Sequence, residues 1–116
     1  MVRYQNECTV EYREHMRDGD GTVELTSLIS GPEELNDKGR LFSKITLHPG
    51  CSIGYHVHDK DAELFYILKG EAQYNDNGQI RTVHAGDVTI CPTGTSHGIA
   101  NASSEDVELV AVIVYA

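Results

Sequence analysis

The residues best suited to chemistry are two histidines two positions apart, His56 and His58, and a glutamate that follows them, Glu63. In a β-strand, side chains alternate between the two faces, so residues two apart point to the same side. Two imidazoles and a carboxylate on one side make a ligand set for a divalent metal ion. Because His-x-His spacing arises easily by chance, the position of the glutamate has to support this interpretation.

Glu63 opens an apolar segment, Glu63–Lys69 (ELFYILK), after a polar turn of four residues. A hairpin return would bring it back beside the histidine pair, and alternation would place it on one face with Phe65 and Ile67. A carboxylate at the head of an inward-facing apolar row is costly to bury unless a cation accompanies it. We therefore expect the two histidines and the glutamate to bind one ion.

Short strands and turns account for most of the remaining sequence. The chain has 116 residues, of which 40% are apolar and 11 are glycine, so its length suits a single domain with many tight turns. We expect a strand at 22–30, a helix of one or two turns that starts at Pro32 and stops at Gly39, and strands from there to the end. The long strand after the histidines should break near Gly70, and Asn77-Gly78 should form a hairpin turn. Eight or nine strands at this spacing predict an all-β sandwich or closed barrel.

The N-terminal part is harder to assign. The first twenty residues are polar, and their pattern leaves helix and strand open, although Val10, Tyr12 and Met16 would form one apolar strip. We expect residues 1–39 to be a short N-terminal extension, whose strand packs on a barrel formed by residues 40–116. Extension and barrel together would form one structural domain.

The final strand predicts a partner. Residues Leu109–Val114 are apolar at every position, and a strand that is apolar on both faces must be covered on both. One face would fill the barrel, and the other would meet either the N-terminal segment or a second subunit. Together with the aromatic alternation around Phe65, this pattern predicts a homodimer.

Charge and cysteine content narrow the function classes. The net charge of −9 argues against nucleic acid and against anionic membrane surfaces, both of which attract basic faces. The three cysteines are not closely spaced, so neither a cysteine zinc site nor a disulfide scaffold is expected. The N-terminus lacks the apolar core of a signal peptide, and no apolar run is long enough to span a bilayer. We expect a cytoplasmic protein whose partners are a small molecule and a second copy of itself.

Two gapped patterns resemble the two sequence motifs of the cupin superfamily. The first motif consists of Gly50, His56, His58, Glu63 and Gly70, and the second of Gly86, Pro92, Gly94, His97 and Asn101. Every defining position is filled, and 15 residues separate the motifs, as in small single-domain members similar to the cupin 2 group. The resemblance covers roughly residues 40–115 and implies a double-stranded β-helix, the cupin jelly-roll barrel, with a metal ion near one mouth. It also implies that His97 joins the other three residues as a ligand.

The ligand set limits the metal and leaves the reaction open. Three imidazoles and one carboxylate suit Zn, Mn, Fe, Ni, Co or Cu, and leave one or two positions for water or substrate. The resemblance favours a small-molecule metalloenzyme, similar to the sugar isomerases, decarboxylases or dioxygenases of the family. The alternative is a module that binds or senses a small molecule without turning it over. A proton-transferring side chain on the cavity wall would favour catalysis, whereas an aliphatic wall would favour binding or oxygen chemistry run by the metal.

Several further side chains could act chemically, and the sequence leaves their roles open. Arg40 and Lys44 are candidates for binding the phosphate of a sugar substrate. His48 lies at a turn, and the sequence does not decide whether it belongs to the site or to the surface. Tyr55 should face away from the neighbouring histidine. The cysteines and tyrosines near the motifs are expected to pack rather than react; they are Cys51, Cys91, Tyr66 and Tyr74.

Overall fold

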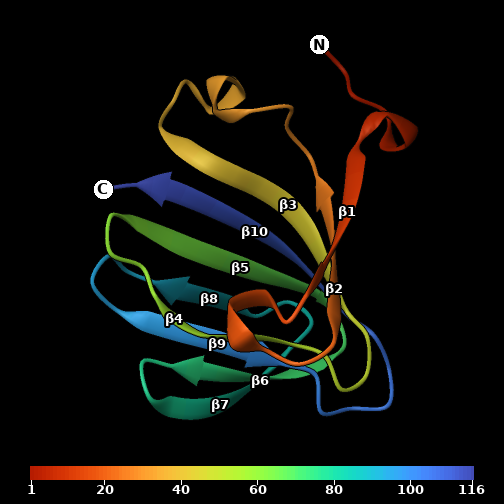
Figure 1. Cartoon of the computed structure of the whole chain (residues 1–116), viewed down its shortest axis with the longest axis vertical. Helices are drawn as coiled ribbons and strands as arrows, with labels where there is room; N and C mark the ends of the chain where they lie inside the picture. Colours follow the sequence, from red (N-terminus) through yellow and green to blue (C-terminus); the bar gives the residue numbers. More distant parts are fainter.

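The computed structural model describes all of residues 1–116 and consists almost entirely of β-strands (Figure 1). Three short 3-10 helices, η1 (Gln5–Glu7), η2 (Met16–Asp18) and η3 (Pro32–Leu35), are the only helices, and none could cross a membrane. The ten strands are β1 (Thr9–Glu14), β2 (Thr22–Ser27), β3 (Gly39–Leu47), β4 (Ser52–Val57), β5 (Asp61–Lys69), β6 (Glu71–Asp76), β7 (Gln79–His84), β8 (Val88–Cys91), β9 (Ser96–Ala100) and β10 (Val107–Tyr115).

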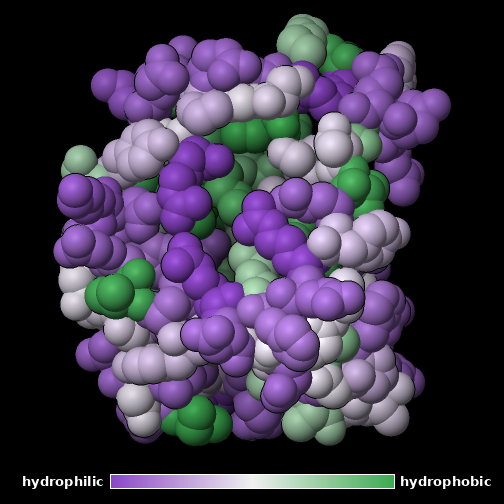
Figure 2. All heavy atoms as spheres, in the orientation of Figure 1, coloured by the Kyte–Doolittle hydropathy of each residue, from purple (hydrophilic) through white to green (hydrophobic).

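The strands form two antiparallel sheets, which confirms the predicted all-β jelly-roll class. The larger sheet has the order β1-β2-β3-β10-β5-β8, and the smaller sheet the order β4-β9-β6-β7. Alternate side chains from both sheets point inward and pack into one core. Its members are Val23, Leu25, Ile45, Leu47, Ile53, Phe65, Ile67, Ala72, Tyr74, Val83, Ile99, Val107, Leu109 and Ala111. Figure 2 shows a hollow in the middle of one face, with hydrophobic side chains on its floor and hydrophilic ones around its rim.

The first strand, β1, comes from the segment whose structure the sequence left open. It pairs with β2, which pairs with β3, so β1 is the outer edge of the larger sheet (Figure 1). Val10 and Tyr12 are exposed on this edge strand, whereas Met16 packs against the core, so the expected apolar strip was wrong. The division of the chain between residues 39 and 40 stays a prediction.

The helix expected from Pro32 is a single 3-10 turn, and Gly39 does not end it. The helix ends at Leu35 and is capped by Asn36, whose φ of 54° is left-handed, a conformation that asparagine tolerates better than most residues. Gly39 instead begins β3, where a side chain would collide with the carbonyl of Ile113 on β10. The glycine is therefore required by a close approach of two strands rather than by a helix end.

The connection between β4 and β5 differs from the hairpin that we expected. β4 pairs with β9, whereas β5 pairs with β10 and β8, so the chain crosses from one sheet to the other between them. Glu63 therefore meets the histidines across the interior of the sandwich and not along a strand ladder. The expected break at Gly70 is confirmed, because its φ of 90° lets the chain return to the smaller sheet as β6.

Candidate metal centre

The four side chains expected to bind a metal come together at one mouth of the barrel. His56 lies on β4, directly opposite His97 on β9, and Glu63 reaches them from β5 in the other sheet. The potential ligand atoms of these three residues and of His58 all lie within 4.8 Å of one another. His56 is half-buried, and the other three side chains are buried.

The spacing of these atoms fits a single ion of the first transition series. His58 Nε2 lies 3.2 Å from His56 Nε2, 3.1 Å from His97 Nε2 and 3.1 Å from Glu63 Oε1. The distance from Glu63 Oε1 to His97 Nε2 is 2.9 Å. Two ligands that lie about 2.1 Å from one ion at right angles are about 3 Å apart. These four distances therefore match those between neighbouring ligands of one transition metal ion.

Contacts to the second nitrogen of each ring hold the imidazoles in this orientation. The Nδ1 of His56 donates to the carbonyl of Gly54 at 2.7 Å, and that of His58 to the Asp61 carboxylate at 2.6 Å. Because both acceptors lack a proton, the neutral rings carry their proton on Nδ1 and point the lone pair of Nε2 toward the cluster. His97 Nδ1 lies 2.8 Å from the hydroxyl of Tyr74. Partners of this kind fix ring orientation and raise the basicity of a metal ligand.

The electrostatics of the cluster favour a bound cation. Burial opposes ionisation of Glu63, but hydrogen bonds from His58 and His97 outweigh it and lower the pKa of this carboxyl. The hydrogen bond to Glu63 raises the pKa of His58, and the one to Asp61 acts in the same direction. Burial lowers the pKa of His56, and the nearby charges of His97 and Arg17 lower it further. A buried carboxylate is therefore kept ionised by protons on the facing rings, and a metal ion bound at the same nitrogens would take the place of those protons.

A small cavity of about 40 Å³ adjoins the ligand atoms, and we call it the metal cavity. This volume has room for roughly three water molecules, or for the few atoms of a small ligand. Its aliphatic wall consists of Met16, Leu41, Ile45, Ile53 and Ile113. Three arginines complete the lining; they are Arg13, Arg17 and Arg40. Apart from His56, His58 and Glu63, the lining holds no side chain that transfers a proton at neutral pH.

The remaining candidates from the sequence lie outside this cavity, with one exception. Arg40 lines it, but Lys44 lies on the outer face of the larger sheet and pairs with Glu108. His48 is exposed and pairs with Asp106, so it takes no part in the site. Tyr55 faces outward, as expected. Cys91 is buried in packing, Cys51 is half-buried, and Tyr66 is exposed on the larger sheet.

Sequence reasoning missed the residues that support the ligands. Asp61 was taken as part of a polar turn, yet it is the buried first residue of β5, and its carboxylate accepts hydrogen bonds from His58 and Arg40. An acid three positions after a candidate histidine was the available signal. Tyr74 was expected only to pack, and burial raises the pKa of its hydroxyl to about 12, so it stays protonated beside His97. No local pattern pointed to this contact, which joins strands β6 and β9.

Comparisons with known proteins agree with the fold. Residues 43–113 match the family model described as Cupin domain. The chain is 42% identical over 114 residues to an oxalate-binding protein of Thermotoga maritima, in an alignment that covers 98% of this chain and 93% of the relative. It superimposes on the crystal structure of a predicted oxalate decarboxylase from Thermotoga maritima with a TM-score of 0.95 and 41% identity over the whole of both chains. The cupin domain of a transcriptional regulator from Enterobacter cloacae shows the fold alone, with a TM-score of 0.69 and 23% identity over 81% of this chain and 97% of that chain. The family match and the near-complete alignment with the first relative show that this chain belongs to the cupin family.

Proposed function

We propose that this cupin binds one divalent transition metal ion through His56, His58, Glu63 and His97, and binds a small carboxylate such as oxalate at that ion. The observation that carries the proposal is the convergence of three ring nitrogens and one buried carboxylate on a single point. The ion, which we expect to be Zn, Mn, Fe, Ni, Co or Cu, supplies Lewis acidity and open positions for carboxylate oxygens. The relative from Thermotoga maritima that is named as oxalate-binding supports this choice of ligand.

The wall of the metal cavity favours binding over turnover. An isomerase or a decarboxylase needs a proton-transferring group beside the reacting atoms. The wall offers only aliphatic side chains and arginines, whose guanidinium groups stay protonated. The second candidate function is that of a dioxygenase, in which the metal activates oxygen. An aliphatic wall suits this chemistry, because it requires no proton donor from the protein.

Oxalate is expected to bind the metal-loaded protein and not the metal-free protein. Isothermal titration of protein loaded with Mn²⁺ should give one oxalate per chain, because two adjacent carboxylates can occupy the open positions of one ion. Protein stripped with a chelator should give no binding heat. Acetate, which presents a single carboxylate, serves as the control and should bind at least about tenfold more weakly.

The fate of the oxalate separates the candidate functions. Recovery of unchanged oxalate after prolonged incubation supports a binding protein. Conversion to formate and carbon dioxide would contradict it in favour of a decarboxylase, and oxygen uptake would favour the second candidate. Equal binding of oxalate to metal-loaded and metal-free protein would contradict a metal-dependent site.

We also propose that a second copy of this chain covers the outer face of the larger sheet. The outer apolar face consists of neighbouring residues from β3, β10, β5 and β8, namely Phe42, Leu64, Tyr66, Val88, Ile90, Val110 and Val112. From the sequence, either the N-terminal segment or a second subunit was expected to cover this face. The N-terminal strand β1 lies at the edge beyond β2 and does not cross it. An apolar patch whose residues are exposed or half-buried favours protein association.

Ile90→Asp is expected to convert a dimer into a monomer, because it places a charge in the middle of the apolar contact. Light scattering after gel filtration should report about twice the chain mass of 12.8 kDa for the unmodified protein and a single chain for the variant. Ile80→Asp is the matched control: Ile80 is 60% exposed on β7 and Ile90 is 58% exposed on β8, but Ile80 lies on the smaller sheet. A monomeric unmodified protein at micromolar concentration would contradict the proposal.

We place the protein in the cytoplasm. All three cysteines are free thiols, which suits a reducing compartment. The net charge of −9 supports a small-molecule ligand rather than nucleic acid or an anionic membrane as the partner of the site.

A further inference from the structure

The arginines of this acidic chain are concentrated beside the metal cavity. The chain carries only five arginines among its nine basic residues. Three of them, Arg13, Arg17 and Arg40, line the metal cavity. Arg3 lines a neighbouring pocket, and only Arg81 lies elsewhere, on the hairpin of β6 and β7. In a chain with a net charge of −9, this distribution points to an anionic ligand.

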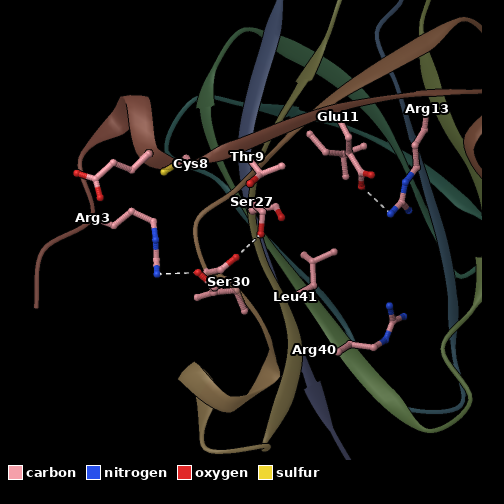
Figure 3. Close-up of a pocket in the computed structure, with 13 residues that line it drawn as sticks. Arg3, Cys8, Thr9, Glu11, Arg13, Ser27, Ser30, Arg40 and Leu41 are labelled. Atoms are coloured by element: carbon pink, nitrogen blue, oxygen red, sulfur yellow. Dashed lines mark hydrogen bonds and ion pairs between the residues drawn. The ribbon is translucent and has the colours of Figure 1, made fainter.

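The neighbouring pocket has about ten times the volume of the metal cavity. It encloses about 400 Å³ between β1, β2 and β3, and we call it the N-terminal pocket. Arg13, Arg40 and Leu41 line both spaces, so the two adjoin each other at these residues. Figure 3 shows Arg13 and Arg40 at one end of the N-terminal pocket, extending from opposite sides toward each other. A ligand at the metal could therefore extend past these two arginines.

The guanidinium groups retain donors for such a ligand. Arg13 uses one nitrogen on Glu11 at 2.7 Å, and Arg40 uses its Nε on Asp61 at 3.0 Å. The side chain of Arg17 makes no hydrogen bond or ion pair, although it lines the metal cavity. Because a guanidinium has five N–H donors, all three arginines can still bind a carboxylate.

The fold places Arg17 at the mouth by a close backbone contact. Arg17 lies in η2 with a left-handed φ of 54°. Its carbonyl sits against Gly54 on β4, where any side chain would collide with it. Gly54 also accepts the hydrogen bond from His56, so one residue links the arginine and a ligand histidine. The position of Arg17 beside the site is therefore built into the packing of η2 on β4.

We propose that Arg13, Arg17 and Arg40 bind the second anionic group of a ligand whose chelating end lies at the metal. The inference rests on the proposed function. The ligand class is a 2-hydroxy or 2-oxo acid with a second carboxylate, longer than oxalate. The two carboxylates of oxalate are adjacent, so a chelated oxalate would stay in the metal cavity and leave the N-terminal pocket unused. A pocket of about 400 Å³ is within the usual range for a small-molecule site.

Acidic side chains pair with two of the three arginines and leave Arg17 without a partner. Glu11 pairs with Arg13 and Asp61 pairs with Arg40, so each of these two guanidinium groups already faces one carboxylate. Arg3 is largely engaged, because it pairs with Glu34 and also donates to Ser30. In the metal cavity, Glu63 faces three arginines. Arg17 has no acidic partner, so the unpaired positive charge lies beside the metal cavity, where the second carboxylate would bind.

The test compares two ligands that share a chelating end. Malate and 2-hydroxybutyrate both carry a 2-hydroxy carboxylate, but only malate has a second carboxylate. Titration of Mn²⁺-loaded protein should show malate binding at least about tenfold more tightly, since charge-assisted hydrogen bonds to arginine are strong. Arg13→Gln and Arg17→Gln should each remove most of this difference, measured as the ratio of the two affinities in the same variant.

Arg81→Gln is the matched control, with the same change of charge at an arginine that lines neither space. It should keep the full preference for malate. Metal content, measured on each variant, should stay at one ion per chain. Equal affinity for the two acids, or loss of the preference in the control, would overturn the inference. If the inference fails but oxalate still binds the metal-loaded protein, the proposed function stands. If oxalate, malate and 2-hydroxybutyrate all fail to bind the metal-loaded protein, both the inference and the proposed function are overturned.

Discussion

His97→Ala is expected to lower the affinity for Mn²⁺ or Zn²⁺ roughly 100-fold or more. Sites with four protein ligands bind Zn²⁺ with about 10–16 kcal/mol, so one ligand accounts for about 3 kcal/mol, which corresponds to this change. Metal at 1,000 times its Kd should stabilise the unmodified protein by about 4 kcal/mol and raise its Tm by about 15 °C. The variant should lose most of this rise. Metal analysis after dialysis and thermal unfolding with and without metal measure both effects.

Two further variants make this result interpretable. His97 is 1% exposed and its ring stacks on Phe65, so alanine there also leaves a hole in the core. His56→Ala tests the same site at a half-buried position at the mouth, where packing matters less. His84→Ala is the control, because His84 is exposed and pairs with Glu71 far from the cluster. Full retention of metal by both site variants would contradict the four-residue centre.

The direction of each ligand side chain followed from the sequence because strand alternation is a local rule. His56 and His58 point to one side, and Glu63 points inward with Phe65 and Ile67, as two-residue periodicity requires. The sequence did not predict which strands pair with one another. The short link after the histidines suits a hairpin equally well, and only the packing of two sheets makes the chain cross the interior there.

The residues that support the metal ligands could not be predicted from the sequence for a related reason. Tyr74 meets His97 through the pairing of β6 with β9, and Arg13 and Arg17 reach the mouth through strand pairing and a glycine contact. These contacts join segments far apart in the chain, and no spacing rule connects them. The cupin motifs supplied His97 by resemblance, but motifs of this kind describe the ligands and not the residues that orient them.

Asp61→Asn is expected to weaken metal binding about 10- to 100-fold, although Asp61 does not belong to the ligand cluster. Its carboxylate accepts the Nδ1 proton of His58 at 2.6 Å and is held by Arg40 at 3.0 Å. Burial opposes ionisation of this carboxyl, but the two hydrogen bonds outweigh it and keep the pKa of Asp61 below its ordinary value. The negative charge makes His58 a more basic ligand. Competition titration with a metal-binding dye measures the loss, and Asp59→Asn, at an exposed neighbour, is the matched control.

The pH dependence distinguishes this charge effect from a merely structural one. A proton and the metal ion compete for His58, whose pKa Glu63 and Asp61 both raise in the metal-free protein. Removal of the Asp61 charge lowers that pKa, so the variant binds metal more weakly but also loses less metal to protons. The ratio of the two affinities should therefore be largest above the raised pKa of His58 and should shrink as the pH falls through it. A ratio that is constant with pH would mean that Asp61 only holds the chain between β4 and β5 in place.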